Sequence, residues 1–211
     1  MSAMTDKIMK RVRAKGRGWV FTPKHFIDFG TRGSVDMALS RLAQAGEIRR
    51  IGRGLYDYPQ LHDKLGALTP DAEMIAQAVS AQSGDRLAPS AAAAANQLGL
   101  STQVPARSSY ATTGRTRVRK AAGRSVTLKH SRAPVLGNAS DAANGVVQYL
   151  AGLGRDKVDA DAISQLAARL DDKDVQALLK GRVQMPGWMG DVVLKIGAVR
   201  IAREGYRLNN A

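Results

Sequence analysis

The segment from Val20 to Tyr58 constrains the fold most, because it alternates helix signals with glycines in an ordered series. Thr22 followed by Pro23 predicts a helix start. The threonine hydroxyl can cap the first turn, and proline is tolerated in that turn because its backbone N–H is not needed for a helical hydrogen bond there. Gly30 is expected to end this short helix, and Ser34 to cap the next one. The segment therefore predicts two consecutive helices separated by a glycine.

The second of these helices carries a regular apolar stripe and is followed by a hairpin. Apolar residues at helical spacing predict one buried face, formed by Val35, Ala38, Leu39, Leu42 and Ala43. Gly46 is expected to end the helix. Residues 48–51 and 55–58 predict strands that are joined by the turn Gly52–Gly54. Two helices and a basic hairpin in this order predict a winged helix-turn-helix.

The outward face of the second helix has the chemistry that reading DNA requires. It is mostly polar and holds Asp36, Met37, Ser40, Arg41 and Gln44. A recognition helix needs a thin polar tip and side chains that reach base edges in the major groove, and arginine is suited to guanine. Arginines of the predicted wing are placed for phosphate or minor-groove contacts. The sequence predicts DNA contacts from Arg32, Ser34, Ser40, Arg41, Gln44, Arg49, Arg50 and Arg53.

A second interpretation of these residues needs no DNA. Polar residues cover the solvated face of any surface helix, and charged residues on an edge hairpin oppose aggregation. A single arginine fits either interpretation. The tip and the wing taken together favour nucleic acid.

The net charge also points to a polyanionic partner. The chain has 32 Lys and Arg against 18 Asp and Glu, a formal charge of +14. Residues 1–60 carry 12 basic and 5 acidic residues, residues 61–137 carry 10 and 4, and residues 138–211 carry 10 and 9. A basic excess of this kind indicates what the protein associates with, and says nothing of its fold.

A second basic segment is expected between Arg86 and Ser140, which contains no Asp or Glu. Alternating Thr, Val and Ser within 107–132 predict two or three antiparallel strands. These strands are expected to meet an anionic surface, either DNA or an acidic protein partner, and the regular spacing of the arginines favours DNA. The candidates for this second basic surface are Arg107, Arg115, Arg117, Arg119, Lys120, Arg124 and Lys129.

No catalytic or metal-binding motif occurs in the sequence. The chain has no cysteine, which excludes disulfides and Cys-ligated zinc and suits a reducing cytosol. His25, His62 and His130 lack metal-ligand spacing, and the Asp residues near 156–161 and 171–174 are expected to cap helices. The N-terminal residues have no apolar run behind their charges and so do not predict a secretory signal, and no run approaches the ~18 apolar residues of a membrane span. We expect a cytoplasmic protein that is not an enzyme and needs no cofactor, metal or membrane.

These patterns predict an α+β protein of two domains. Residues 1–59 are expected to form the N-terminal winged helix-turn-helix, with a first helix over 5–15 and a short strand over 19–21. Residues 60–211 are expected to form a mixed α/β second domain, with a connector over 61–68 and helix starts at Thr69–Glu73 and at Ser90. This domain is predicted to contain a small antiparallel sheet at about 105–132 and C-terminal helices at about 138–203.

Several segments resemble AbiEi-like antitoxins, the transcriptional autoregulators of type IV toxin–antitoxin (abortive infection) systems. Residues 33–59 carry the N-terminal likeness, G-S-V-D-M-A-L-S-R-L-A-Q-A-G-E-I-R-R-I-G-R-G-L-Y-D-Y-P. Residues 94–105, A-A-N-Q-L-G-L-S-T-Q-V-P, look like the start of the second domain of this family. The T-x-G-x-x-R pattern from Thr112 to Arg117 and M-P-G-W-M at 185–189 also fit. The likeness extends from about Lys7 to Ile201.

The resemblance implies a winged helix that binds the promoter of its own operon. It implies a C-terminal domain needed to counteract a co-encoded, nucleotidyltransferase-like toxin, for which direct contact is not required. It places the DNA contacts on Arg32, Ser34, Ser40, Arg41, Arg49, Arg50 and Arg53. The expected partner is double-stranded DNA with repeated half-sites, bound cooperatively by a protein that can be a monomer in solution. A stand-alone winged-helix regulator without a toxin partner is the alternative.

Overall fold

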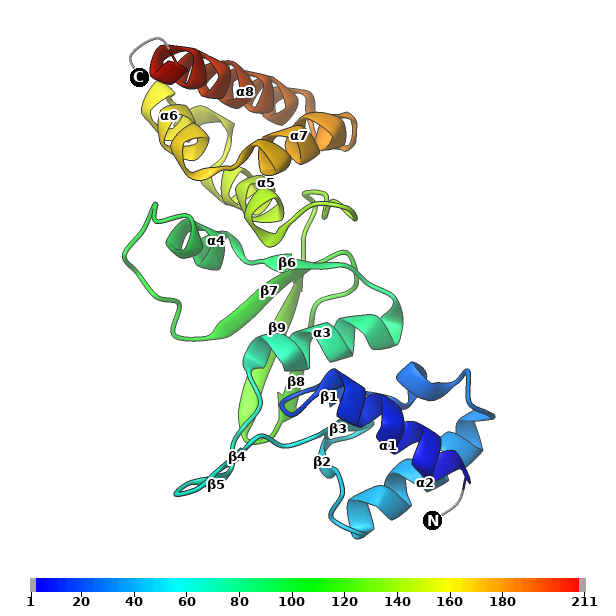
Figure 1. Ribbon diagram of the computed structural model, residues 1–211. Helices are drawn as coiled ribbons and strands as arrows, with labels where there is room; N and C mark the ends of the chain where they lie inside the picture. The colour runs from blue at the N-terminus through cyan, green and yellow to red at the C-terminus, as the bar shows by residue number, and fades with distance from the viewer. Residues whose placement is uncertain (1–2, 209–211) are drawn as a thin grey trace. The chain divides into compact units, whose positions relative to one another are not determined.

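A computed structural model describes residues 3–208, which fold as an α+β protein with eight α-helices and small antiparallel sheets (Figure 1). The chain forms two compact units. The first unit comprises Met1–Asp85 and Thr116–Leu128, and the second unit comprises Arg86–Arg115 and Lys129–Ala211. The domain boundary expected at Pro59 therefore lies inside the first unit, which also contains a third helix and most of a later hairpin.

The N-terminal part of the first unit contains two α-helices and a three-stranded antiparallel sheet. Its elements are α1 (Ala3–Lys15), β1 (Val20–Phe21), the 3-10 helix η1 (Pro23–Phe26), α2 (Arg32–Gln44), β2 (Arg49–Gly52) and β3 (Leu55–Asp57). The strand order is β1-β3-β2, with Val20 opposite Asp57 and Arg50 opposite Tyr56. Figure 1 shows α1 and α2 in blue and cyan beside this sheet.

The apolar stripes of α1 and α2 meet in one core. Burial of apolar surface is the main force holding such helices together. The stripe predicted for α2 is confirmed at four of its five positions, since Ala43 is only partly buried. The buried side chains of this core are Ile8, Met9, Val12, Phe21, Phe26, Val35, Ala38, Leu39, Leu42, Ile48 and Tyr56.

Two expectations for this region were wrong. The helix expected to run from Thr22 to Gly30 is only the 3-10 turn η1, and Gly30 does not end it in a left-handed conformation. Gly30 is exposed, and a Cβ there would lie 2.7 Å from the terminal methyl group of Met4, a flexible side chain that can move aside. The cap of α2 is Thr31, whose hydroxyl accepts the N–H of Ser34 at 3.3 Å, so Ser34 lies inside the helix.

The rest of the first unit consists of one helix and two hairpins. These elements are β4 (Leu61–His62), β5 (Gly66–Ala67), α3 (Ala72–Ser83), β8 (Arg117–Ala121) and β9 (Arg124–His130). The hairpin β4–β5 lies in a stretch expected to be a connector, and α3 begins where the sequence predicts. β8 and β9 pair in register from Arg117 opposite Leu128 to Ala121 opposite Arg124, and the last two residues of β9 belong to the second unit.

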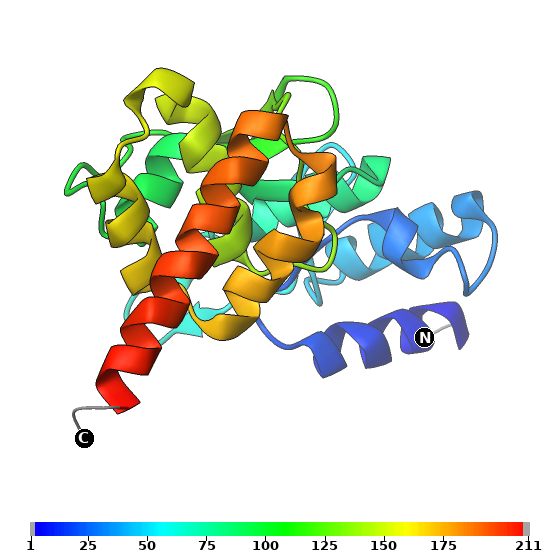
Figure 2. The ribbon, with the colours of Figure 1, turned by 90° about the horizontal axis from the view of Figure 1, so that it is seen from above.

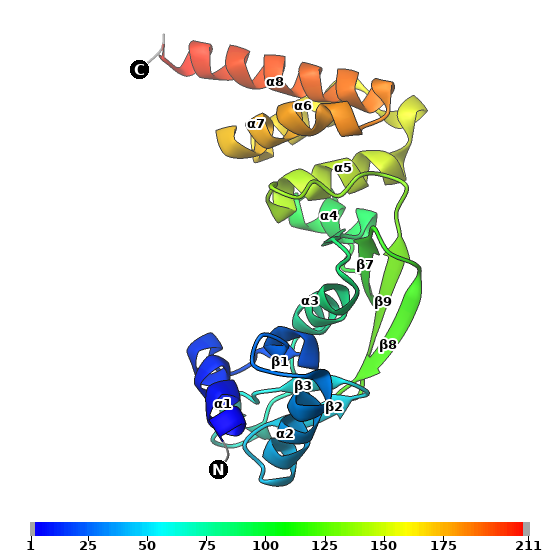
Figure 3. The same ribbon diagram turned by 90° about the vertical axis from the view of Figure 1, so that its right-hand side faces the viewer.

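The second unit is mostly helical. It contains β6 (Leu87–Pro89), α4 (Ala91–Gln97), β7 (Ser108–Thr112), α5 (Asp141–Leu153), α6 (Ala160–Arg169), α7 (Asp172–Gly181) and α8 (Gly187–Leu208), with the 3-10 turns η2 (Arg155–Lys157) and η3 (Arg182–Gln184). Figure 3 shows α8 over α6 and α7, with α5 and α4 beneath, and Figure 2 shows α8 running beside α6 and α7. No helix within residues 3–208 is long and apolar enough to cross a membrane.

Side-chain caps start four helices of this unit, and those at Ser90, Asp159 and Asp171 were predicted. The side chains of Ser90, Ser140, Asp159 and Asp171 each accept the backbone N–H three residues further along the chain, at distances from 2.7 to 3.3 Å. Such a cap supplies one of the helix N–H groups with the partner it lacks. Asp159 and Asp171 therefore have a structural role at helix starts.

Small residues allow α4 and α5 to approach closely. A Cβ added to Gly152 would lie 2.6 Å from the Cβ of Ala91, and one added to Gly145 would lie 3.4 Å from the Cβ of Ala94. The Cβ of an alanine is fixed by the backbone and cannot move to another rotamer. The close approach of α4 to α5 at Gly152 therefore requires that this position carry no side chain. The alanine-rich helix is thus a packed element of the second unit.

We expect Gly152→Ala to lower the free energy of unfolding. Overpacking costs about 1–3 kcal/mol, and the gain in helix propensity of about 0.5–1 kcal/mol offsets only part of it. Gly190→Ala in α8 is the matched control, because its added Cβ would meet no atom closer than 3.9 Å. Denaturant unfolding followed by circular dichroism should show a loss for the first and a small gain for the second. Equal effects would contradict the close packing of α4 on α5.

Candidate nucleic-acid interface

The exposed face of α2 is polar along most of its length. Val35, Leu39 and Leu42 turn into the core. The predicted site residues Ser40, Arg41 and Gln44 are exposed on the other side, as is Met37. The Arg41 side chain has no hydrogen-bond or ion-pair partner among the described residues. This face therefore presents one unpaired cation and two neutral hydrogen-bonding side chains to solvent.

Two predicted residues at the N-terminal tip of α2 are engaged within the chain. The Ser34 hydroxyl donates to the carbonyl oxygen of Thr31 at 2.8 Å. The Nε of Arg32 lies 3.0 Å from both carboxylate oxygens of Asp36, one turn further along α2. Both residues of this ion pair are about half exposed, so the pair is a surface salt bridge of small energy that another anion can break.

Arg49 has a structural role that the sequence did not indicate. The Asp57 side chain on β3 is only 1% exposed, and the Arg49 guanidinium on β2 donates to its two oxygens at 3.1 and 2.6 Å. Arg49 also donates to the carbonyl oxygen of Leu68 at 2.7 Å. The hydrogen bonds to Asp57 raise the pKa of the guanidinium above its ordinary value. Because these bonds use its donors, Arg49 holds the hairpin together instead of projecting toward a ligand.

The other two arginines of the β2–β3 hairpin project into solvent. Arg50 and Arg53 are exposed, and neither pairs with an acidic side chain within the described part of the chain. The pairing of β2 with β3 shifts between Arg50 and Gly52, and Gly54 has a φ of +67°, which closes the tight turn. The hairpin thus carries two unpaired cations at its exposed edge and tip.

The tip of the β8–β9 hairpin rests against the β2–β3 hairpin. The N–H of Ala122, in the turn between β8 and β9, donates to the carbonyl oxygen of Ile51 at 3.0 Å. A Cβ on Gly52 would lie 3.2 Å from the carbonyl oxygen of Lys120, so glycine permits this close approach. The contact fixes two basic hairpins side by side within the first unit.

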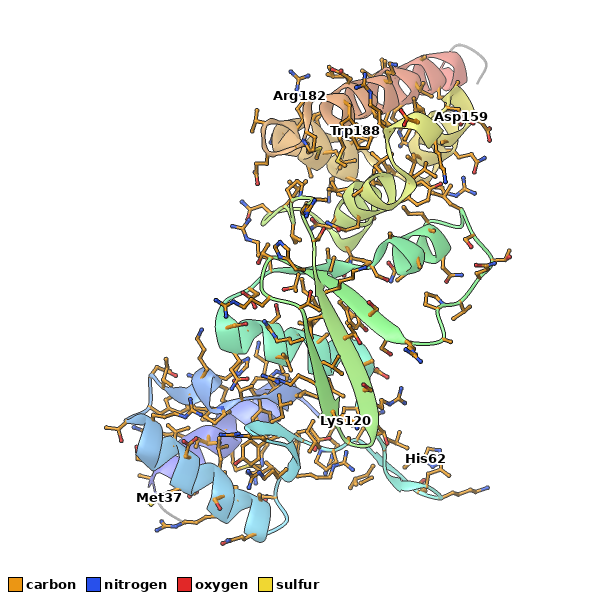
Figure 4. The ribbon with its side chains drawn as sticks, turned by 180° about the vertical axis from the view of Figure 1, so that it is seen from behind. Met37, His62, Lys120, Asp159, Arg182 and Trp188 are labelled. Atoms are coloured by element: carbon orange, nitrogen blue, oxygen red, sulfur yellow. The ribbon has the colours of Figure 1, made fainter. Side chains whose placement is uncertain are left out.

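The second basic surface is divided between the two units. Arg119, Lys120 and Arg124 are exposed on the β8–β9 hairpin in the first unit, and we call them the hairpin cations. Figure 4 shows Lys120 near the end of this hairpin. The remaining exposed members, Arg107, Arg115 and Lys129, belong to the second unit.

Arg117, the seventh candidate, is largely neutralised. Its guanidinium lies 2.8 Å from a carboxylate oxygen of Asp85 and 2.8 Å from the hydroxyl oxygen of Ser83. The Ser83 hydroxyl, followed by the Arg117 guanidinium, lowers the pKa of the Asp85 carboxyl. Arg117 therefore ties β8 to the end of α3, and its charge is not available to a partner.

The arrangement can bind an anionic surface, and its chemistry is that of hydrogen bonding and charge. Unpaired guanidinium and ammonium groups donate to phosphate oxygens, and arginine also reads the guanine edge. Among residues 3–208 no three His, Asp or Glu side chains gather as a metal site. Sequence reasoning missed the contact between the hairpins, which joins segments about 70 residues apart. It placed Met37 on the outward face without counting it as a site residue, although an apolar residue on an otherwise polar face was a signal.

We expect Arg49→Ala to destabilise the fold, because it leaves the buried Asp57 carboxylate without a partner. The loss should be about 2–4 kcal/mol, somewhat below that of a fully buried pair, since Arg49 is 33% exposed. Arg50→Ala removes the same side chain from the next, exposed position and should change the unfolding free energy by less than about 0.5 kcal/mol. Urea denaturation of the two variants measures the difference. An Arg49→Ala protein as stable as Arg50→Ala would rule out the structural role.

Comparison with known proteins places the chain in a family. No curated protein and no solved structure matches it. A family model does match, over residues 7–178, which include the whole of α2, both basic hairpins and the helices as far as α7. The chain therefore belongs to DUF6088, a family of unknown function.

Proposed function

We propose that the first unit contains a winged helix-turn-helix that binds duplex DNA in a sequence-specific manner. The observation that carries the proposal is the pairing of two features in one compact unit: the exposed polar face of α2, and a neighbouring hairpin with unpaired arginines. The element order α1, β1, η1, α2, β2, β3 and the sheet order β1-β3-β2 support this proposal, with the 3-10 turn η1 in the place of the first helix of the helix-turn-helix pair. In this assignment α2 is the recognition helix and the β2–β3 hairpin is the wing.

The predicted residues take different roles in this proposal. Arg41 reads a base edge from the last turn of α2, with Ser40 and Gln44 as shorter donors. Arg50 and Arg53 bind phosphates and set the register of the domain on the duplex. Arg32 and Ser34 lie at the tip of α2, and Arg32 exchanges Asp36 for a phosphate on binding. Arg49 supports the wing through Asp57 and makes no DNA contact of its own.

The hairpin cations extend the proposed DNA surface. Their hairpin is joined to the wing by the hydrogen bond from Ala122 to Ile51, so it is held at a fixed distance from the wing arginines. The acidic-partner interpretation of this segment would place carboxylates against the same cations. Fixed cations beside a DNA-binding wing suit a continuous phosphate backbone better.

The physiological role that we propose is that of a cytoplasmic autorepressor and antitoxin. The resemblance of residues 33–59 and 94–105 to AbiEi-like antitoxins supports it. In this role the protein represses its own operon through the first unit and counteracts a nucleotidyltransferase-like toxin, with no catalytic step of its own. The alternative is a stand-alone regulator of the same architecture. A neighbouring gene for a nucleotidyltransferase favours the antitoxin, and its absence favours the stand-alone regulator.

The proposed operator contains repeated half-sites. A single small winged domain makes few base contacts, so tight binding requires several copies on one duplex. Copies bound to one face of B-DNA lie about 34–36 Å apart or a multiple of this distance. Binding is then cooperative even when the free protein is a monomer.

We expect Arg41→Ala and Arg53→Ala to weaken DNA binding in different ways. Arg41→Ala should cost about 1–3 kcal/mol on the promoter of the protein's own gene and much less on random duplex, because it removes a base contact. Arg53→Ala should weaken both duplexes alike and make the slope of log affinity against log salt shallower by about 0.9, because it removes one phosphate contact. Fluorescence anisotropy over a salt series measures both quantities.

The controls separate local contacts from net charge. Replacing the three hairpin cations by alanine should flatten the salt slope further, whereas alanine at the exposed Arg155, Lys157 and Lys180 of the second unit removes the same charge and should change it little. If the Arg41→Ala/Arg53→Ala double variant bound the promoter as tightly as the wild type, the assignment of α2 and the wing would fail.

Repression and toxin neutralisation should be separable. We expect the Arg41→Ala/Arg53→Ala variant to lose repression of a reporter driven by its own promoter, yet to protect cells that express the neighbouring toxin gene from a foreign promoter. Both arginines are exposed, so the variant should fold normally, which circular dichroism checks. Loss of protection together with repression would show that neutralisation works through DNA binding alone.

A further inference from the structure

Met37 is the one large apolar side chain on the exposed face of α2, all of whose residues are described. It is 60% exposed, while Val35, Leu39 and Leu42 of the same helix are buried. Figure 4 shows Met37 at the outer side of α2. An exposed methionine contributes little buried apolar area to the core of the first unit. Its position therefore points to a contact between α2 and a partner.

The surroundings of Met37 leave room for a ligand to approach it closely. Helical side chains lean toward the N-terminus, so Met37 covers the surface above Gly33, one turn earlier. A Cβ at Gly33 would meet no atom within 4 Å, and no side chain stands there. Ser40 and Arg41 lie one turn later on the same face. Met37 is thus a flexible apolar group between an open glycine and an unpaired guanidinium.

We propose that Met37 reads the 5-methyl group of a thymine in the operator, an inference that rests on the proposed function of α2. The thymine methyl is the apolar feature of the major groove, and apolar side chains distinguish thymine by contact with it. The N-terminal half of a recognition helix is the part that lies nearest the bases. Arg41 beside Met37 binds a guanine edge, so the pair reads a thymine close to a guanine.

The charge around Met37 favours DNA over a protein partner as its occupant. Arg41 on the same face and Arg50 and Arg53 on the β2–β3 hairpin of the same unit are exposed and have no acidic partner among the described residues. An apolar protein surface seated on Met37 would bury or crowd these cations without compensation. A duplex offers phosphates to the cations and a methyl group to the methionine at once.

Deoxyuridine substitution tests the contact directly, because it removes only the methyl group and keeps every hydrogen-bonding group of the base. The full-length wild type first selects its best site from a pool of random duplexes. Each thymine of that site is then replaced singly by deoxyuridine, and affinities are measured for the wild type and for Met37→Ala. We expect the wild type to lose about 3- to 5-fold at one thymine per half-site, as burial of one methyl group predicts. Met37→Ala should bind thymine and deoxyuridine equally at that position.

Two further variants complete the test. Met37→Leu keeps an apolar group of similar size and should retain the sensitivity to deoxyuridine. Leu61→Ala removes an apolar side chain that is 58% exposed in β4 of the same unit, and should leave the sensitivity unchanged. Circular dichroism confirms that each variant folds.

The outcomes distinguish this inference from the proposed function. If the wild type selects no site from the pool, the proposed function fails, and the inference fails with it. If it selects a site but no thymine responds to deoxyuridine, or Met37→Ala responds as the wild type does, only the role of Met37 is overturned. A selected site that contains no thymine would likewise overturn only the role of Met37.

Discussion

The buried carboxylate of Asp57 is the constraint on which the proposed DNA-binding surface depends. An isolated buried charge is costly, so Asp57 requires a cation, and Arg49 on the adjacent strand supplies it through two hydrogen bonds. The same guanidinium reaches the carbonyl oxygen of Leu68 and ties down the chain that follows. One buried anion thereby orders the hairpin from which Arg50 and Arg53 project.

The basic residues of the first unit form two groups: those paired with an acidic side chain and those without such a pair. Arg49 and Arg117 are held by Asp57 and Asp85 and stabilise strands, whereas Arg41, Arg50 and Arg53 are exposed and unpaired among the described residues. A formal charge of +14 thus overstates the charge available to a partner and says nothing of its location. The contact between Ala122 and Ile51 determines where part of this charge lies, since it holds the hairpin cations beside the arginines of the β2–β3 hairpin.

The described residues of the second unit are stabilised by helix caps and close helix packing, and not by a buried ion pair like that of Arg49 and Asp57. Its helices begin at Ser and Asp caps, and α4 meets α5 through alanines and glycines that leave no room for larger side chains. Local hydrogen bonds define where each helix starts, and steric fit defines how closely two of them pack. The near balance of charge in residues 138–211 agrees with an ordinary helical surface.

Local chemistry in the sequence was sufficient to predict the α+β class, most helix starts, the strands of 107–132 and the buried stripe of α2, because caps, turns and periodicity act between neighbours in the chain. Sequence reasoning failed where the role of a residue depends on a contact with a residue far away in the chain. The acidic partner of Arg49 lies on β3, and that of Arg117 lies directly after α3. The contact of the β8–β9 hairpin with Ile51 likewise joins residues far apart in the chain. Only the tertiary structure could decide which arginines are paired, because the energy of a charge depends on its burial and its nearest counter-ion, and neither is a property of the local sequence.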